Sequence, residues 1–354
     1  MAKAVKVRLE SLTGLRAIAA GLVFLSHFGD LFAEHFSTIA NRAFSSGRCG
    51  VSFFFVLSGF VLAWSARPDD KAGAFYWRRF ARIVPAHVAA WVIAIVIISW
   101  QGLSVLGADD GFSLFLLQAW FPGPGWHFAG NPVAWSLSCE AFFYLVFPVL
   151  LPFVEKGGPA RRRSLCLILF ALAIAVPTIT QLAAGPVHPG TWIFYVFPVV
   201  RCLEFTIGIG VACMVRRGEL LRIPRVISYV LAIVGLVVMQ WAPISWISVA
   251  SMLIPFTVVI VAGAQADVAG EASAMSSNLW VRLGSWSYAF YLIHELVLRV
   301  LGLFVDISAL GWGGIALWTA VAIVVATLGS AFLYTCLERP AERWLRRAPP
   351  AEHQ

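Results

Sequence analysis

The sequence predicts an all-α, polytopic integral membrane protein with about ten transmembrane helices and both termini in the cytoplasm. Hydrophobic residues make up 60% of its 354 residues and charged residues only 12%, whereas soluble domains have roughly 45–50% apolar and about 25% charged residues. The apolar residues form runs long enough to cross a bilayer, and the basic residues gather on one side of those runs. This composition excludes a soluble globular enzyme, a disordered chain and a nucleic-acid-binding protein.

Ten apolar runs lie near the length of about 20 residues that a helix needs to span the bilayer. The predicted spans are residues 12–33, 50–66, 83–101, 132–153, 164–183, 191–215, 226–242, 245–264, 283–304 and 312–335. A shorter run at 112–121 could be re-entrant or interfacial. Ten spans use about 200 residues, so we expect residues 1–354 to form one transmembrane domain without a soluble accessory domain.

Lysine and arginine are unequally divided between the two sides of these spans. Of the 26 in the chain, 22 lie in the N-terminal segment with the start of the first span, in every second connection, and in the C-terminal tail. The other side carries only Arg42 and Arg48, and Arg201 and Arg299 lie inside spans. Because cytoplasmic loops are rich in basic residues, both termini are predicted to be cytoplasmic in a bacterial cytoplasmic membrane.

The six cysteines are scattered along the chain, and none forms a C-x-x-C pair. Five fall in apolar runs, where a cysteine behaves as a small hydrophobic residue. We therefore predict neither a disulfide framework nor a metal site.

Titratable residues inside the predicted spans are candidates for function, because a charge near the centre of a span costs about 2.5–3.5 kcal/mol. They are His27, Glu140, Arg201, Glu204, His294 and Glu295. At a rise of about 1.5 Å per residue, His27, Glu140, Arg201 and His294 come out at similar depths, which favours convergence in one cavity. The alternatives are structural. A single buried histidine often only bonds between helices, and Arg201 and Glu204 could neutralise each other at i and i+3.

A basic cluster lies at the cytoplasmic end of the same helix face as His27. Arg16 and His27 are eleven residues apart, which returns to nearly the same face after a rise of about 16 Å. Arg78, Arg79 and Arg82 lie just before the third span. This arrangement would suit a donor with phosphates at the basic end and a long thin arm that reaches His27. Taken alone, the three arginines are more typical of topology anchors.

Six motifs follow one another along the chain, and each is weak by itself. They are R-x10-H at Arg16 and His27, G-V-S-F-F-F-V-L-S-G-F-V-L at 50–62, R-R-x-x-R at Arg78, Arg79 and Arg82, W-S-L-S-C-E-A-F-F-Y at 135–144, S-Y-A-F-Y-L-I-H at 287–294, and L-E-R-P at 337–340. In this order the chain resembles the integral membrane acyltransferase-3 family of O-acyltransferases. Many members have Asp where this chain has Ser52 and a second Glu where it has Ala141.

The resemblance implies transfer of an acyl group, expected to be acetyl, from cytoplasmic acyl-coenzyme A to a hydroxyl group. The acceptor would be a carbohydrate, a lipid-linked glycan or a secondary metabolite, and no tightly bound cofactor is expected. The expected roles are general base for His27, orientation of His27 for Glu140, phosphate binding for Arg16, Arg78, Arg79 and Arg82, and the acceptor side or oxyanion for Arg201 and His294. A covalent acyl-histidine intermediate is an alternative.

Two rival functions fit parts of the same pattern. A transporter or flippase for a glycan or lipid also has many spans and charges at mid-depth, but it should show related halves or paired broken helices, and no internal repeat is evident in the sequence. Membrane-bound O-acyltransferases also use an intramembrane histidine, but the ordered motifs fit that class less well.

Overall fold

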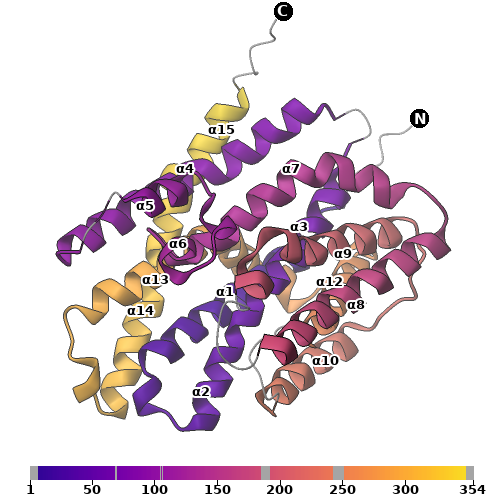
Figure 1. Ribbon diagram of the computed structural model, residues 1–354. Helices are drawn as coiled ribbons and strands as arrows, with labels where there is room; N and C mark the ends of the chain where they lie inside the picture. The colour runs from indigo at the N-terminus through magenta and orange to yellow at the C-terminus, as the bar shows by residue number, and fades with distance from the viewer. Residues whose placement is uncertain are drawn as a thin grey trace, which may run out of the picture.

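The computed structural model describes residues 7–67, 70–103, 105, 107–184, 192–241 and 251–347, and every regular element among them is a helix (Figure 1). The long helices are α1 (Glu10–Leu31), α3 (Gly50–Ser65), α4 (Ala72–Trp100), α7 (Trp135–Glu155), α8 (Pro159–Ala184), α9 (Pro198–Arg216), α10 (Arg225–Val238), α12 (Leu253–Val268), α13 (Asn278–Gly302) and α14 (Trp312–Leu333). Short elements include α2 (Thr38–Ser45), α5 (Ala108–Leu114), α6 (Pro124–His127), α15 (Arg339–Arg347) and the 3₁₀ turn η7 (Ala274–Ser276). Two π-helical turns, η5 (Trp192–Val196) and η9 (Tyr334–Glu338), precede α9 and α15.

The all-helical membrane fold predicted from the composition is confirmed. Seven segments among the described residues are long and apolar enough to cross a membrane: Glu10–Leu31, Thr38–Ser65, Ala72–Trp100, Pro132–Glu155, Pro159–Ile179, Trp192–Arg216 and Trp312–Arg346. The apolar helices Arg225–Trp241 and Leu253–Val268 are shorter. The remaining long helix, α13, carries Arg282, Glu295 and Arg299.

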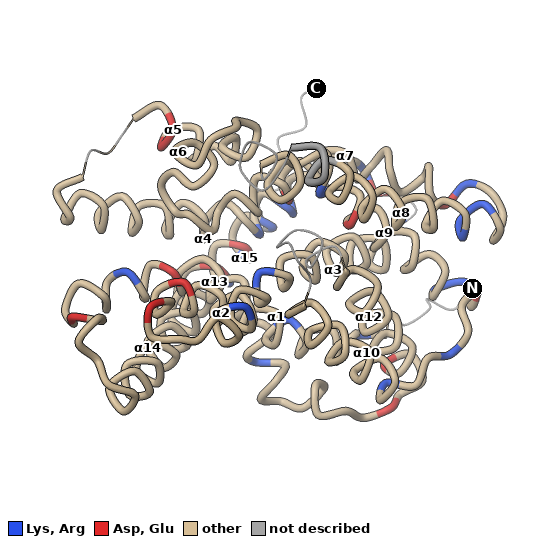
Figure 2. Tube along the Cα trace, turned by 60° about the horizontal axis from the view of Figure 1, so that its bottom comes forward, with Lys and Arg blue, Asp and Glu red and all other residues tan. Residues whose placement is uncertain are grey.

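Each of the ten predicted apolar runs overlaps one of the long helices, but the number of about ten spans stays a prediction. Residues 191, 242 and 245–250 of those runs lie outside the described residues, as do both ends of the chain, 1–6 and 348–354. The short run at 112–121 forms part of α5 and one 3₁₀ turn. Figure 2 shows long uncharged stretches along α10 and α14.

Helices α3 and α9 pack backbone against backbone. A Cβ atom at Gly59 would overlap the carbonyl oxygen of Phe205, and one at Gly208 would overlap the carbonyl oxygen of Val56. Small residues allow such close approach between membrane helices, where van der Waals contact replaces the hydrophobic effect as the driving force. The close contact fixes the separation of α3 and α9.

Helix α1 is enclosed by similar contacts. A Cβ atom at Gly284 of α13 would overlap the carbonyl oxygen of Thr13, and one at Gly47 would overlap that of Leu22. A Cβ atom at Gly14 of α1 itself would overlap the carbonyl oxygen of Met275 in η7. Because neighbours touch the backbone of α1 at several heights, the side chains that it presents are held in fixed positions.

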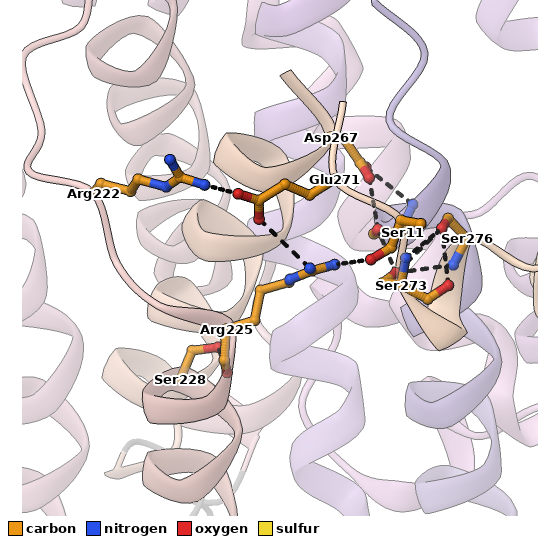
Figure 3. Close-up of polar contacts among 9 residues, drawn as sticks. Ser11, Arg222, Arg225, Ser228, Asp267, Glu271, Ser273 and Ser276 are labelled. Atoms are coloured by element: carbon orange, nitrogen blue, oxygen red, sulfur yellow. Dashed lines mark hydrogen bonds and ion pairs between the residues drawn. The ribbon is translucent and has the colours of Figure 1, made fainter. Parts of the chain in front are cut away.

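A polar network fixes the beginning of α1 (Figure 3). The amide of Ser11 donates to a carboxylate oxygen of Asp267 over 2.9 Å, and its hydroxyl donates to the other oxygen over 2.6 Å. The first amides of a helix have no partner within the helix, and a negative charge there also favours the helix dipole. Nearby, Glu271 pairs with both Arg222 and Arg225. The network ties α1 to the end of α12.

Candidate active site

Two adjoining cavities follow one another along α1, which contributes residues to both. The smaller one, of about 150 Å³, lies among α1, α3, α4, α7 and α13. It is lined near the start of α1 by Arg16, and by Arg79 and Arg82 of α4. The larger one, of about 750 Å³, includes His27 and Asp30 from the last turns of α1. We call them the basic cavity and the outer cavity.

In the basic cavity, the guanidinium of Arg79 makes no ion pair among the described residues. It lies 5.8 Å from the ring centre of Tyr144 and 5.9 Å from that of Phe75. Arg78, the adjacent residue, pairs with Asp70 instead and is not among the residues that line the cavity. Arg78 therefore does not line the basic cavity with Arg79 and Arg82, since successive helical residues point about 100° apart, and its part in phosphate binding stays a prediction.

Arg82 lines the basic cavity, and its guanidinium also pairs with carboxylates outside the cavity lining. It pairs with Glu338, and Glu342 lies 3.4 Å away. Glu338 is only 1% exposed and ends the π-helical turn η9. A buried acidic side chain needs a partner, so Glu338 fixes where the guanidinium of Arg82 lies. The L-E-R-P motif thus contributes a structural partner to the basic cluster.

Glu140 lies in the basic cavity and not beside His27. Ser58 donates to its Oε1 over 3.1 Å, and Tyr144 donates to the same oxygen over 2.5 Å. The expected orientation of His27 by Glu140 is not supported by this geometry, because the two side chains line different cavities. The estimate of equal depth stays a prediction, and it carried no information about the direction in which each side chain points from its helix.

The outer cavity combines charged and aromatic side chains. Arg48 donates to both carboxylate oxygens of Asp30, over 2.7 and 2.8 Å, and Arg299 donates to Glu295 over 2.5 Å. Trp135, Trp192 and Tyr195 supply flat faces, and His127 is the last residue of α6. Burial lowers the pKa of His127 below its ordinary value. Paired charges beside aromatic rings are suited to binding a polar, hydroxyl-bearing molecule.

His294 contacts the ring of His27 and does not line the outer cavity. The two ring centres are 5.2 Å apart, and His294 is completely buried. Its Nδ1 lies 2.8 Å from the carbonyl oxygen of Tyr291, and its Nε2 has no hydrogen-bond partner among the described residues. Because Nδ1 must donate to that carbonyl, Nε2 is left with its lone pair. His294 is not among the residues that line either cavity, so it contacts His27 from within the protein.

Arg201 forms the structural pair that its spacing allowed. Its guanidinium donates to Glu204 over 2.8 Å and to the hydroxyl of Ser52 over 3.1 Å. It also lies 4.9 Å from the ring centre of Phe55. Arg201 is 4% exposed and is not among the residues that line the two cavities. The ion pair lies within α9, its hydrogen bonds to Ser52 connect α9 to α3, and a role of Arg201 on the acceptor side stays a prediction.

Several residues of the two cavities were not identified from the sequence. Tyr144 could have been found, since it follows Glu140 by one helical turn and such pairs face the same side. Glu338 stood in a motif without an assigned role. Ser58, and the pair of Asp30 with Arg48, carried no signal, because their function depends on which helices become neighbours.

The chain is similar in sequence to known acyltransferases. A family model described as an acyltransferase domain matches residues 9–336. The acyltransferase MdmB of Streptomyces mycarofaciens is 38% identical over 97% of this chain and 94% of its own length. Nodulation protein 10 of Rhizobium leguminosarum bv. viciae is 26% identical over 82% of this chain and 81% of its own. The peptidoglycan O-acetyltransferase OatA of Listeria monocytogenes is 29% identical over 40% of this chain and 24% of its own length. No solved structure matches the chain.

Proposed function

This chain belongs to the acyltransferase-3 family, and we propose that it transfers an acyl group, in the simplest case acetyl, from cytoplasmic acyl-coenzyme A to a hydroxyl group. The acceptor would be a carbohydrate, a lipid-linked glycan or a secondary metabolite in or at the bacterial cytoplasmic membrane. The observation that supports this most is the pair of cavities joined by one face of α1, with Arg16 in one and His27 in the other.

The donor would bind at the basic cavity. Guanidinium groups of Arg16, Arg79 and Arg82 line it, and planar guanidinium groups match phosphate oxygens. A space of about 150 Å³ is small for a nucleotide but admits a thin chain. In the proposed complex the nucleotide and its phosphates remain at the basic mouth. Only the pantetheine arm and the acyl group enter.

His27 would act as the general base. In the proposed step the neutral imidazole takes the proton of the acceptor hydroxyl as the oxygen attacks the thioester carbonyl carbon. The bond between that carbon and sulfur then breaks, and the coenzyme A thiolate leaves with the electron pair. His294, 5.2 Å from His27 between ring centres, would hold the His27 ring in place. An acyl-histidine intermediate remains the alternative chemistry.

Glu140 receives a different proposed role from the one its depth suggested. It accepts hydrogen bonds from Ser58 and Tyr144, and the Tyr144 ring in turn lies 5.8 Å from the Arg79 guanidinium. We assign Glu140 to shaping the donor end, where its negative charge partly offsets the three arginines. In this arrangement it is a positioning residue and takes no proton.

The acceptor would occupy the outer cavity. Hydroxyl groups can bond to the paired charges of Asp30 and Arg48, while Trp135 and Trp192 offer apolar faces. One relative is a peptidoglycan O-acetyltransferase, and this name supports an acceptor that carries hydroxyl groups.

The test uses purified protein, labelled acetyl-coenzyme A and a panel of hydroxyl acceptors. We expect acceptor-dependent release of coenzyme A with label in the acceptor, and loss of both in His27→Ala. His35→Ala is the matched control, because His35 lies outside both cavities. Passage of the acceptor across vesicles without release of coenzyme A would instead indicate a transporter.

A further inference from the structure

Tyr291 stands at the boundary between the two cavities. It is one of two residues, with Val51, that line both of them. Its side chain is 7% exposed. It lies on α13 one helical turn before His294, the residue that contacts His27. The Tyr291 residue therefore lies where the basic cavity adjoins the cavity that includes His27.

Hydrogen bonds hold the Tyr291 ring across the boundary. Ser136 of α7 donates to the Tyr291 hydroxyl over 2.8 Å, and that hydroxyl lies 3.2 Å from the carbonyl oxygen of Val133, to which it donates. The ring meets that of Phe54 edge to face, with 6.0 Å between centres. These contacts come from α3, from α7 and from the 3₁₀ turn Pro132–Ala134 that precedes α7, so the ring lies between α13 and these elements.

From this placement we propose that Tyr291 is a positioning residue that seals the path of the thioester against water, so that the acyl group goes to the acceptor and not to hydrolysis. The proposal rests on the proposed acyl transfer. The ring closes around the arm of the donor and separates the thioester from the solvent of the outer cavity until an acceptor occupies the space next to His27.

The chemistry explains why such a seal is needed. Water and an alcohol are the same kind of nucleophile, and His27 would activate either. In the side reaction a water oxygen attacks the thioester carbonyl carbon, the bond from carbon to sulfur breaks, and acetate and the coenzyme A thiol are formed. The base cannot discriminate between the two reactions, so discrimination has to come from the exclusion of water.

The experiment compares two products from the same sample. Acceptor-independent release of coenzyme A is followed with a thiol reagent, and acylated acceptor is measured by mass spectrometry. In Tyr291→Ala the ratio of hydrolysis to transfer should rise by about ten-fold. In Tyr291→Phe it should rise by about three-fold, because the ring stays and only its hydrogen bonds are lost.

Tyr288→Ala is the matched control. Tyr288 is on the same helix and lines the basic cavity but not the outer one, so its loss can weaken donor binding without changing the ratio. If Tyr291→Ala transfers acyl groups with an unchanged ratio of hydrolysis to transfer, the proposed role of Tyr291 is wrong, while the proposed acyl transfer still stands. If Tyr291→Ala does not fold, Ser136→Ala removes one hydrogen bond to the ring, and an unchanged ratio there would overturn the seal. Absence of acceptor-dependent release from the unmodified protein would overturn the proposed function first.

Discussion

Replacing Arg79 by alanine should weaken the binding of acyl-coenzyme A, while the same change at Arg78 should not. Arg79 lines the basic cavity without an ion-pair partner among the described residues, and Arg78 is paired with Asp70 outside the cavity. A hydrogen bond to a charged group is worth about 1.5–3 kcal/mol, which corresponds to about a 10-fold to 150-fold increase in KM for the donor. Losing the partly exposed pair at Arg78 costs about 0.2–1 kcal/mol of stability.

The assay measures initial rates over a range of acetyl-coenzyme A at fixed acceptor, and binding of coenzyme A alone by calorimetry. Arg79→Lys should fall between wild type and Arg79→Ala, because it keeps the charge but loses the planar fork. Raising the salt concentration should reduce the differences in KM between wild type, Arg79→Lys and Arg79→Ala, because salt screens the attraction between guanidinium and phosphate. The assignment of the basic cavity to the donor would be refuted by equal KM values for wild type and Arg79→Ala, or by an Arg78→Ala variant that is impaired as strongly.

Three further changes test other parts of the structure. His27→Ala should abolish transfer in the coenzyme A release assay while its elution on size exclusion stays that of wild type; residual turnover above a few per cent would contradict the assigned base. Gly208→Ala forces a Cβ atom into the backbone of α3 and should cost about 1–3 kcal/mol, seen as a lower unfolding temperature, whereas Gly73→Ala, in open space, should not. The hydrogen bond from Arg162 lowers the pKa of Glu219 in the folded protein. The pair therefore stabilises the fold at pH values above the pKa of an unfolded glutamate, about 4.3. This stabilisation is lost as the pH falls through the lower pKa that Glu219 has in the folded protein. Glu219→Gln should therefore unfold at a lower temperature than wild type at neutral pH, with a gap that closes in acid; a gap independent of pH would contradict the pair.

The helical fold could be predicted from the sequence because its cause is local. A run of about 20 apolar residues in a bilayer has to satisfy its own backbone hydrogen bonds, and a helix does so within the segment. The buried pair of Arg201 and Glu204 was also open to prediction, since i and i+3 residues share a helix face and neither charge can be buried alone. The observed pair confirms that alternative.

The grouping of the site could be predicted only in part, because it depends on rotation about each helix axis. Depth along the axis can be estimated from the rise per residue, and it placed His27 and Glu140 at similar heights. The cavity that His27 or Glu140 faces depends on which other helices pack against its own helix. The glycine contacts that decide this, such as Gly284 against α1, give no sign in the sequence of the partner that they meet.

The position of Glu338 shows a second limit. It ends a π-helical turn, in which the hydrogen bonds run from i to i+5 and the following side chains are rotated relative to a regular helix. Regular helical spacing along α14 therefore predicts the wrong face for Glu338. Only the folded chain brings it to Arg82, far away in the sequence.

The proposed reaction explains why Arg16 and His27 lie far apart along the same helix. Moving the phosphates of coenzyme A into the membrane would cost far more than moving a neutral thioester, because each charge has to be desolvated. A basic mouth at one end and a base about 16 Å further along the same helix face let the charges stay in place while a neutral chain reaches the reaction centre. It follows that the length of the donor arm is itself a specificity element. A donor that keeps the nucleotide but carries a shortened arm should bind to the basic cavity almost normally and fail to transfer its acyl group. Transfer from such a donor at the normal rate would show that His27 is not reached from the basic cavity.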